Sequence, residues 1–61
     1  MKSNELLKKF TKAGWQEIRQ NGSHKIMKHP MKDLIISLPW HGSKEVPTGT
    51  ANKLLKQAGL K

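Results

Sequence analysis

The sequence predicts an α+β fold in which a helix, three strands and a second helix follow one another, an α-β-β-β-α order. Apolar residues recur at helical spacing near both ends of the chain, and three strand-like runs separated by short turns lie between them. With 61 residues the chain has the length of one domain, which we expect to span residues 1–61. Both helices can bury their apolar stripes against one face of a three-stranded antiparallel sheet, which leaves the other face open.

The first helix is expected over residues 4–13, because the apolar residues are spaced three or four apart and lysines occupy the other side. Ser3 is a suitable N-cap, and Gly14 suits the left-handed position that ends a helix. In that arrangement Trp15 packs back on Phe10.

The last helix is expected from about residue 50, with Leu54, Leu55 and Ala58 as its apolar stripe. Gly59 takes the same terminal position as Gly14, and Leu60 can pack back on Leu55. Both helices therefore have well-defined ends.

The strands are expected over residues 15–20, 24–29 and 34–38. Residues 29–33 form the second turn, and Pro39 ends the third strand because proline cannot continue a ladder of backbone hydrogen bonds. The residues expected to point inward from the third strand are Leu34, Ile36 and Leu38.

Asn21-Gly22 is a strong hairpin signal, since both residues tolerate positive φ. A two-residue loop would place Ile18 opposite Lys25, whereas a three-residue loop over residues 21–23 places Ile18 opposite Ile26 and Gln20 opposite His24. The apolar pattern favours the three-residue loop, because register follows burial. His24 then begins the second strand at one end of the sheet.

The charge balance points to a polyanionic partner. The sequence has twelve Lys and Arg residues and only four Asp and Glu residues, a formal net charge of +8. Phosphate backbones are the obvious ligand for such a surface. Solubility, an anionic membrane surface and an acidic protein partner are the alternatives, and the short lysine-bearing helices are unlike membrane-surface helices. The sequence contains no Cys, no leader-like apolar stretch and no apolar run long enough to cross a bilayer, so a cytoplasmic protein is expected.

His24 is the candidate catalytic residue. An imidazole can exchange a proton near neutral pH, and RNA can be cut without a metal because its own 2′-OH attacks the adjacent phosphorus once a base removes the proton. The competing interpretation is an exposed histidine at a strand end with no chemistry. Lys or Arg groups near His24 would stabilise the negative charge of the transition state.

The candidates for RNA contact come from the hairpin and from the start of the last helix. Gly22 is needed mainly for the turn, and it would also let RNA approach the backbone. Ser23 either donates a hydrogen bond to a phosphate or closes the loop. Thr48-Gly49-Thr50 presents helix-terminal amides that a phosphate or an ordinary Thr cap would satisfy. The full set is Gly22, Ser23, Lys25, Lys28, Arg19, Lys44 and Lys53.

No metal site is expected. His24 and His29 are an odd number of residues apart and point to opposite sides of an extended strand, and no Cys is present to complete a tetrahedral shell with His41. Trp15 is expected in the core. Trp40 either stacks on a base or covers the sheet edge.

Three stretches of the chain resemble the HicA family of bacterial toxins: LLKKFTKAGW, RQNGSHKIMKHP and LPWHGSKEVPTGTANKLLKQAGL. The resemblance implies a double-stranded-RNA-binding-domain-like fold, cleavage of messenger RNA as an endoribonuclease, inhibition by a cognate HicB-type antitoxin, and His24 as the catalytic histidine. Family members often carry a ring just after this histidine, where Lys25 and Ile26 stand here.

We expect single-stranded RNA as the substrate, because a duplex holds its sugar-phosphate geometry. We expect a monomer when the protein is free of its antitoxin. A non-catalytic RNA-binding module of the same shape is the alternative, and a protein whose charge serves only an acidic protein partner is a third.

Overall fold

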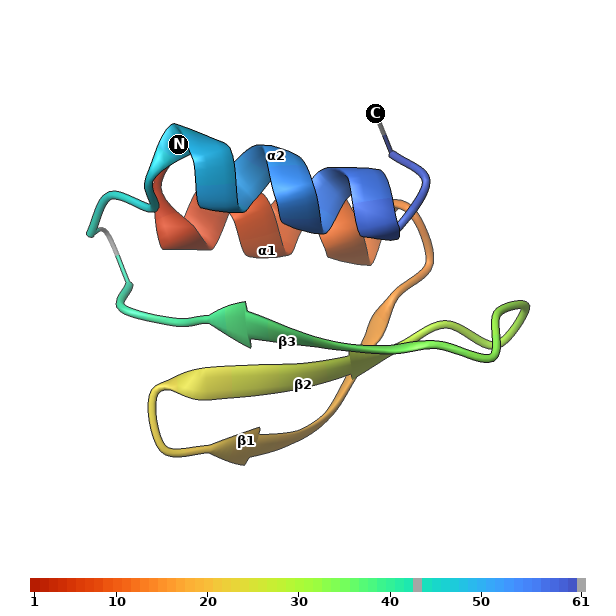
Figure 1. Ribbon diagram of the computed structural model, residues 1–61. Coiled ribbons are helices and arrows are strands. Elements are labelled where there is room, and N and C mark those ends of the chain that lie inside the picture. Colours follow the sequence, from red (N-terminus) through yellow and green to blue (C-terminus); the bar gives the residue numbers. More distant parts are fainter. Residues whose placement is uncertain (43, 61) are drawn as a thin grey trace.

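The structure is a computed structural model that describes residues 1–42 and 44–60. It has the predicted order of elements, with three antiparallel strands arranged β1-β2-β3 and both helices on one face of the sheet (Figure 1). The elements are α1 (Ser3–Lys12), β1 (Gln16–Asn21), β2 (His24–Lys28), β3 (Ile35–Pro39) and α2 (Thr48–Gln57). The predicted fold class is confirmed, and within the described ranges no helix is long and apolar enough to cross a membrane.

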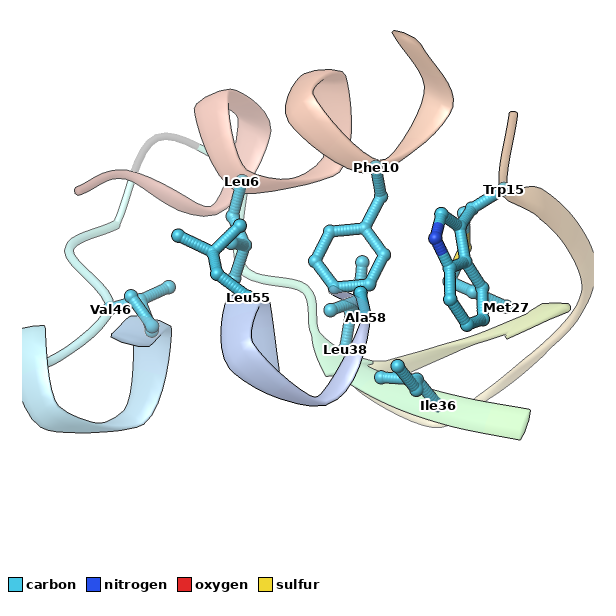
Figure 2. Close-up of a cluster of buried hydrophobic side chains, with 10 residues drawn as sticks. Leu6, Phe10, Trp15, Met27, Ile36, Leu38, Val46, Leu55 and Ala58 are labelled. Atoms are coloured by element: carbon cyan, nitrogen blue, oxygen red, sulfur yellow. The ribbon is translucent and has the colours of Figure 1, made fainter. Parts of the chain in front are cut away.

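The core lies between the helices and strands β2 and β3 (Figure 2). Met27 of β2 and Ile36 and Leu38 of β3 are at most 3% exposed, whereas all six residues of β1 are exposed. The core residues are Leu6, Phe10, Trp15, Met27, Ile36, Leu38, Val46, Ala51, Leu55 and Ala58. Leu34, expected to point inward, is 39% exposed because it precedes β3. β1 therefore extends the sheet beyond the area that the helices cover.

The helix ends follow the predicted glycine signals. Gly14 has φ 98°, and the amide of Trp15 donates to the carbonyl of Phe10 at 3.0 Å. Gly59 has φ 74°, and the amide of Leu60 donates to Leu55 at 2.8 Å. Both patterns are Schellman motifs.

The start of α1 differs from the prediction. Ser3 is the first residue of the helix and is 1% exposed, so it is not the N-cap. Its amide donates to the carbonyl of Lys44 and the amide of Asn4 donates to Gly42, both at 3.0 Å. Backbone carbonyls from the segment between β3 and α2 thus satisfy the first two amides of the helix.

The hairpin register also differs. Asn21 lies opposite His24 and Arg19 opposite Ile26, so the loop contains only Gly22 and Ser23. Positive φ at Gly22 alone is the sign pattern of a type II′ turn, which needs glycine at its first central position. A bulge at Ile18 then shifts the register by one residue.

Candidate nucleic-acid interface on the open sheet face

The face of the sheet that the helices leave uncovered carries His24. Met27 points into the core, so residues an odd number away from it on β2 project to the other side of the sheet. His24 is exposed there, opposite Asn21 of β1 and Pro39 of β3. The imidazole is therefore presented at the end of an open, solvent-facing surface.

Arg19 and Lys28 share this open face with His24. Arg19 lies opposite Ile26, two residues along β2 from His24, so it is a diagonal neighbour of His24, at roughly 7–8 Å between backbones. Lys28 lies four residues along the strand from His24, about 13 Å away at 3.3 Å per residue. An anionic group beside His24 would therefore be within reach of Arg19, whereas Lys28 would face another part of the same surface.

Lys25 projects to the helix-covered side, away from His24. Its ammonium group donates to Glu17 Oε1 at 2.9 Å and to Gln20 Oε1 at 3.3 Å. The same group lies 4.8 Å from the centre of the Trp40 ring. The structure thus separates Lys25 from the other two basic candidates of the hairpin.

Two hydrogen bonds to backbone carbonyls hold the turn before His24. The amide of Trp40 donates to the carbonyl of Ser23 at 2.7 Å, and Gln20 Nε2 donates to the carbonyl of Gly22 at 3.1 Å. Hydrogen-bonded and non-hydrogen-bonded pairs alternate along an antiparallel ladder. Because Trp40 and Ser23 form a hydrogen-bonded pair, the next pair, His24 and Pro39, is a non-hydrogen-bonded one. Pro39 therefore lies where the ladder requires no N–H.

The remaining RNA-contact candidates lie outside the sheet. Lys53 is exposed on α2, in the helical layer, and Lys44 is exposed in the segment before that helix. α2 begins at Thr48 with Pro47 as its N-cap residue, so neither predicted Thr occupies the N-cap position. These two lysines are not gathered with His24 on one face.

The other histidines have different surroundings. His29 Nε2 lies 3.0 Å from the carbonyl of Ala13, and Nδ1 accepts the amide of Met31 at 3.0 Å, an arrangement that suits a neutral ring with its proton on Nε2. The ring also packs edge-on against the Trp15 ring, with 5.5 Å between the ring centres. His41 is exposed. Within residues 1–42 and 44–60, no three His, Cys, Asp or Glu side chains gather closely enough to hold a metal ion.

A hollow of about 420 Å³ lies between the two helices. Its lining is Met1, Lys9, Lys12, Asn52, Leu55 and Leu60, and it includes neither His24 nor any of the RNA-contact candidates. A polymer needs a surface along which it can lie, so the open sheet face that carries His24 is the better candidate interface.

Two neighbours of His24 were missed by the sequence prediction. Asn21, rather than Gln20, faces His24 across the hairpin, and Trp40 bonds to the residue before it. The signal for the first was Gly22, which can stand at the first central position of a type II′ turn as well as at the second of type I′. The contact to Trp40 joins residues 17 apart in the sequence and has no local signature.

The comparisons with known proteins agree with the fold and its order of elements. The family model described as HicA toxin of bacterial toxin-antitoxin matches residues 3–60. The chain is similar to a chain of a solved HicA3 and HicB3 toxin-antitoxin complex, with 34% identity and a TM-score of 0.78 over 100% of this chain and 97% of that one. No match was found among curated proteins. The match over residues 3–60 establishes that the chain belongs to the HicA family of toxins from bacterial toxin–antitoxin systems.

Proposed function

We propose that this protein is a metal-independent endoribonuclease that cleaves messenger RNA, with His24 as its catalytic acid–base residue. The observation that carries the proposal is the exposed imidazole of His24 on the open face of a sheet, with Arg19 as its diagonal neighbour. A net charge of +8 supports RNA as the substrate class. Messenger RNA as the substrate implies the cytoplasm as the site of action.

In the proposed reaction, neutral His24 accepts the proton of the ribose 2′-OH. The 2′-oxygen forms a bond to the adjacent phosphorus, the bond from phosphorus to the 5′-oxygen breaks, and the leaving 5′-oxygen takes a proton from solvent water. The products are a 2′,3′-cyclic phosphate and a 5′-OH end. Arg19 stabilises the charge that builds on the phosphoryl oxygens, for which a planar guanidinium is well suited.

The open face favours single-stranded RNA. The sugar and phosphate must rotate until the 2′-oxygen lies in line with the leaving oxygen, and an unpaired strand allows that rotation. Lys28 further along β2 would contact a neighbouring phosphate of the same strand, and Gly22 and Ser23 would allow close approach of the backbone at the turn. Lys44 and Lys53 would extend the basic surface beyond the sheet.

A HicB-type antitoxin is the proposed protein partner, because the similar solved structure is a HicA3 and HicB3 toxin-antitoxin complex. We propose that the antitoxin inhibits by covering the open face. The toxin is a monomer when it is free.

Cleavage of a 5′-labelled single-stranded RNA in the presence of EDTA tests this function. The wild type is expected to cut the strand and leave cyclic phosphate ends, and His24→Ala to lose at least about 100-fold in rate, the usual worth of general acid–base catalysis. His41→Ala is the matched control, since it removes another exposed histidine. Equal rates for His24→Ala and wild type would refute the assignment, and binding without cleavage by wild type would favour the non-catalytic module.

A further inference from the structure

Both chain neighbours of His24 are tied to the same residue, Trp40. The carbonyl of Ser23 accepts the Trp40 amide at 2.7 Å, and the ammonium group of Lys25 lies 4.8 Å from the centre of the Trp40 ring. Trp40 directly follows β3, and in Figure 1 the segment leaving β3 lies at the same end of the molecule as the β1–β2 turn. The backbone of His24 is thus fixed on either side by one anchor from another part of the chain.

Lys25 is fixed in turn from β1. Glu17 Oε1 accepts its ammonium group at 2.9 Å, and the Lys25 side chain is only 12% exposed. An ammonium group that is paired with a carboxylate, lies near an indole ring and is largely withdrawn from solvent is poorly placed to contact a phosphate. The contacts of Lys25 instead link β1, β2 and Trp40 on the side of the sheet opposite the imidazole.

We propose that Glu17, Lys25 and Trp40 form a brace that positions His24 for catalysis, and that Lys25 is a positioning residue rather than an RNA ligand. This inference rests on the proposed ribonuclease function. The brace acts from the helix-covered side, so it restrains the backbone of His24 while leaving the open face free for RNA. A general base must lie within hydrogen-bond reach of the 2′-OH, and small displacements of such a group reduce rates strongly.

Steady-state kinetics of purified variants on one single-stranded RNA test the brace. Lys25→Met keeps an unbranched side chain one atom shorter and removes its charge, and Glu17→Gln removes the acceptor charge. Both are expected to lower kcat by about tenfold or more while KM stays within about twofold, because a displaced base slows the chemical step without weakening binding. Lys25→Arg keeps the charge and the contact with the ring, and it should retain at least about a third of wild-type kcat.

Lys28→Met is the matched control, because it removes the same charge from the same strand on the open face. It is expected to raise KM and to make KM less dependent on salt, as the loss of one phosphate contact does. If Lys25→Met behaves in this way, Lys25 is an RNA ligand and the brace is refuted. Wild-type kcat and KM for Lys25→Met, alongside an inactive His24→Ala, refute the brace and leave the proposed function standing.

Amide hydrogen exchange provides a readout that needs no cleavage. In Lys25→Met, the amide of Trp40, which donates to Ser23, and the amide of His24 are expected to exchange about tenfold faster, whereas the amide of buried Met27 keeps its wild-type rate. Unchanged exchange at all three would show that Lys25 does not hold the hairpin. A wild type without ribonuclease activity would refute the proposed function, while the exchange rates would still decide whether the brace exists.

Discussion

At the scale of single residues, His29 has a structural position that its sequence context did not reveal. It was expected only as a turn residue before Pro30, yet its ring nitrogens contact the backbones of Ala13 and Met31, each at 3.0 Å. The ring thereby joins the end of α1 to the turn after β2. The sequence could not show this, because the contact with Ala13 spans 16 residues.

His29→Ala is therefore expected to destabilise the protein by about 1–3 kcal/mol, since it leaves the Ala13 carbonyl and the Met31 amide without their partner. Urea unfolding followed by circular dichroism measures the loss. His41→Ala, which alters an exposed ring, should change the free energy of unfolding by no more than about 0.5 kcal/mol. Equal losses in the two variants would contradict the structural role of His29.

Gly14 is restricted both by its backbone and by this histidine. It has φ 98°, and a Cβ placed there would lie 2.9 Å from His29 Nε2. At Gly59, φ is 74° and a Cβ would meet the mobile end of Lys32 at 3.3 Å. Gly14→Ala should therefore destabilise the protein more than Gly59→Ala, and the difference should shrink in a His29→Ala background. Equal losses of stability for Gly14→Ala and Gly59→Ala in the wild-type background would show that the His29 ring moves aside at little cost.

At the scale of elements, the prediction was correct where the apolar pattern was compatible with only one secondary structure. Helical spacing located α1 and α2, and glycine located their ends, because both signals lie within a few residues of the structure they determine. The hairpin register was wrong at the turn because both Asn21 and Gly22 tolerate positive φ. Beyond the bulge, Gln16 lies opposite Lys28, which is the register that a three-residue loop predicts.

The identity of the turn can be tested at Gly22, where a Cβ would have open space around it and only φ 61° opposes a side chain. L-Ala at this position should cost about 1 kcal/mol, whereas D-Ala, which favours positive φ, should be neutral or stabilising. Chemical synthesis gives both variants, and thermal unfolding compares them. Equal stability of the two would contradict the left-handed turn.

At the scale of the whole molecule, a small core must stabilise a fold that carries a large positive charge. A domain of this size typically has a stability of about 3–5 kcal/mol, and replacing a buried Phe with Ala costs about 3–5 kcal/mol. Phe10→Ala should therefore leave much of the free protein unfolded at 25 °C, whereas Met31→Ala, at an 85% exposed position, should not. Circular dichroism distinguishes the two, and a fully folded Phe10→Ala would show that the stability was underestimated.

The charge of the whole molecule could be predicted from the composition, but the side of the sheet on which Arg19 lies could not. The sequence placed Arg19, Lys25 and Lys28 together near His24. The structure keeps Arg19 and Lys28 on the open face and pairs Lys25 with Glu17 on the other side. Alternation along β2 already separates Lys25 from Lys28. The bulge at Ile18, which has no sequence pattern of its own, brings Arg19 to the side of His24.

The central claim is that His24, on the open face, activates the 2′-OH of a bound RNA strand. The most direct measurement compares wild-type cleavage of one labelled strand with cleavage of the same strand carrying a single 2′-deoxy sugar on the 5′ side of the mapped cut. The account predicts that cutting at that bond disappears while other bonds are still cut and leave 2′,3′-cyclic phosphates. Undiminished cutting at the 2′-deoxy position would contradict it, because another nucleophile would then attack the phosphorus.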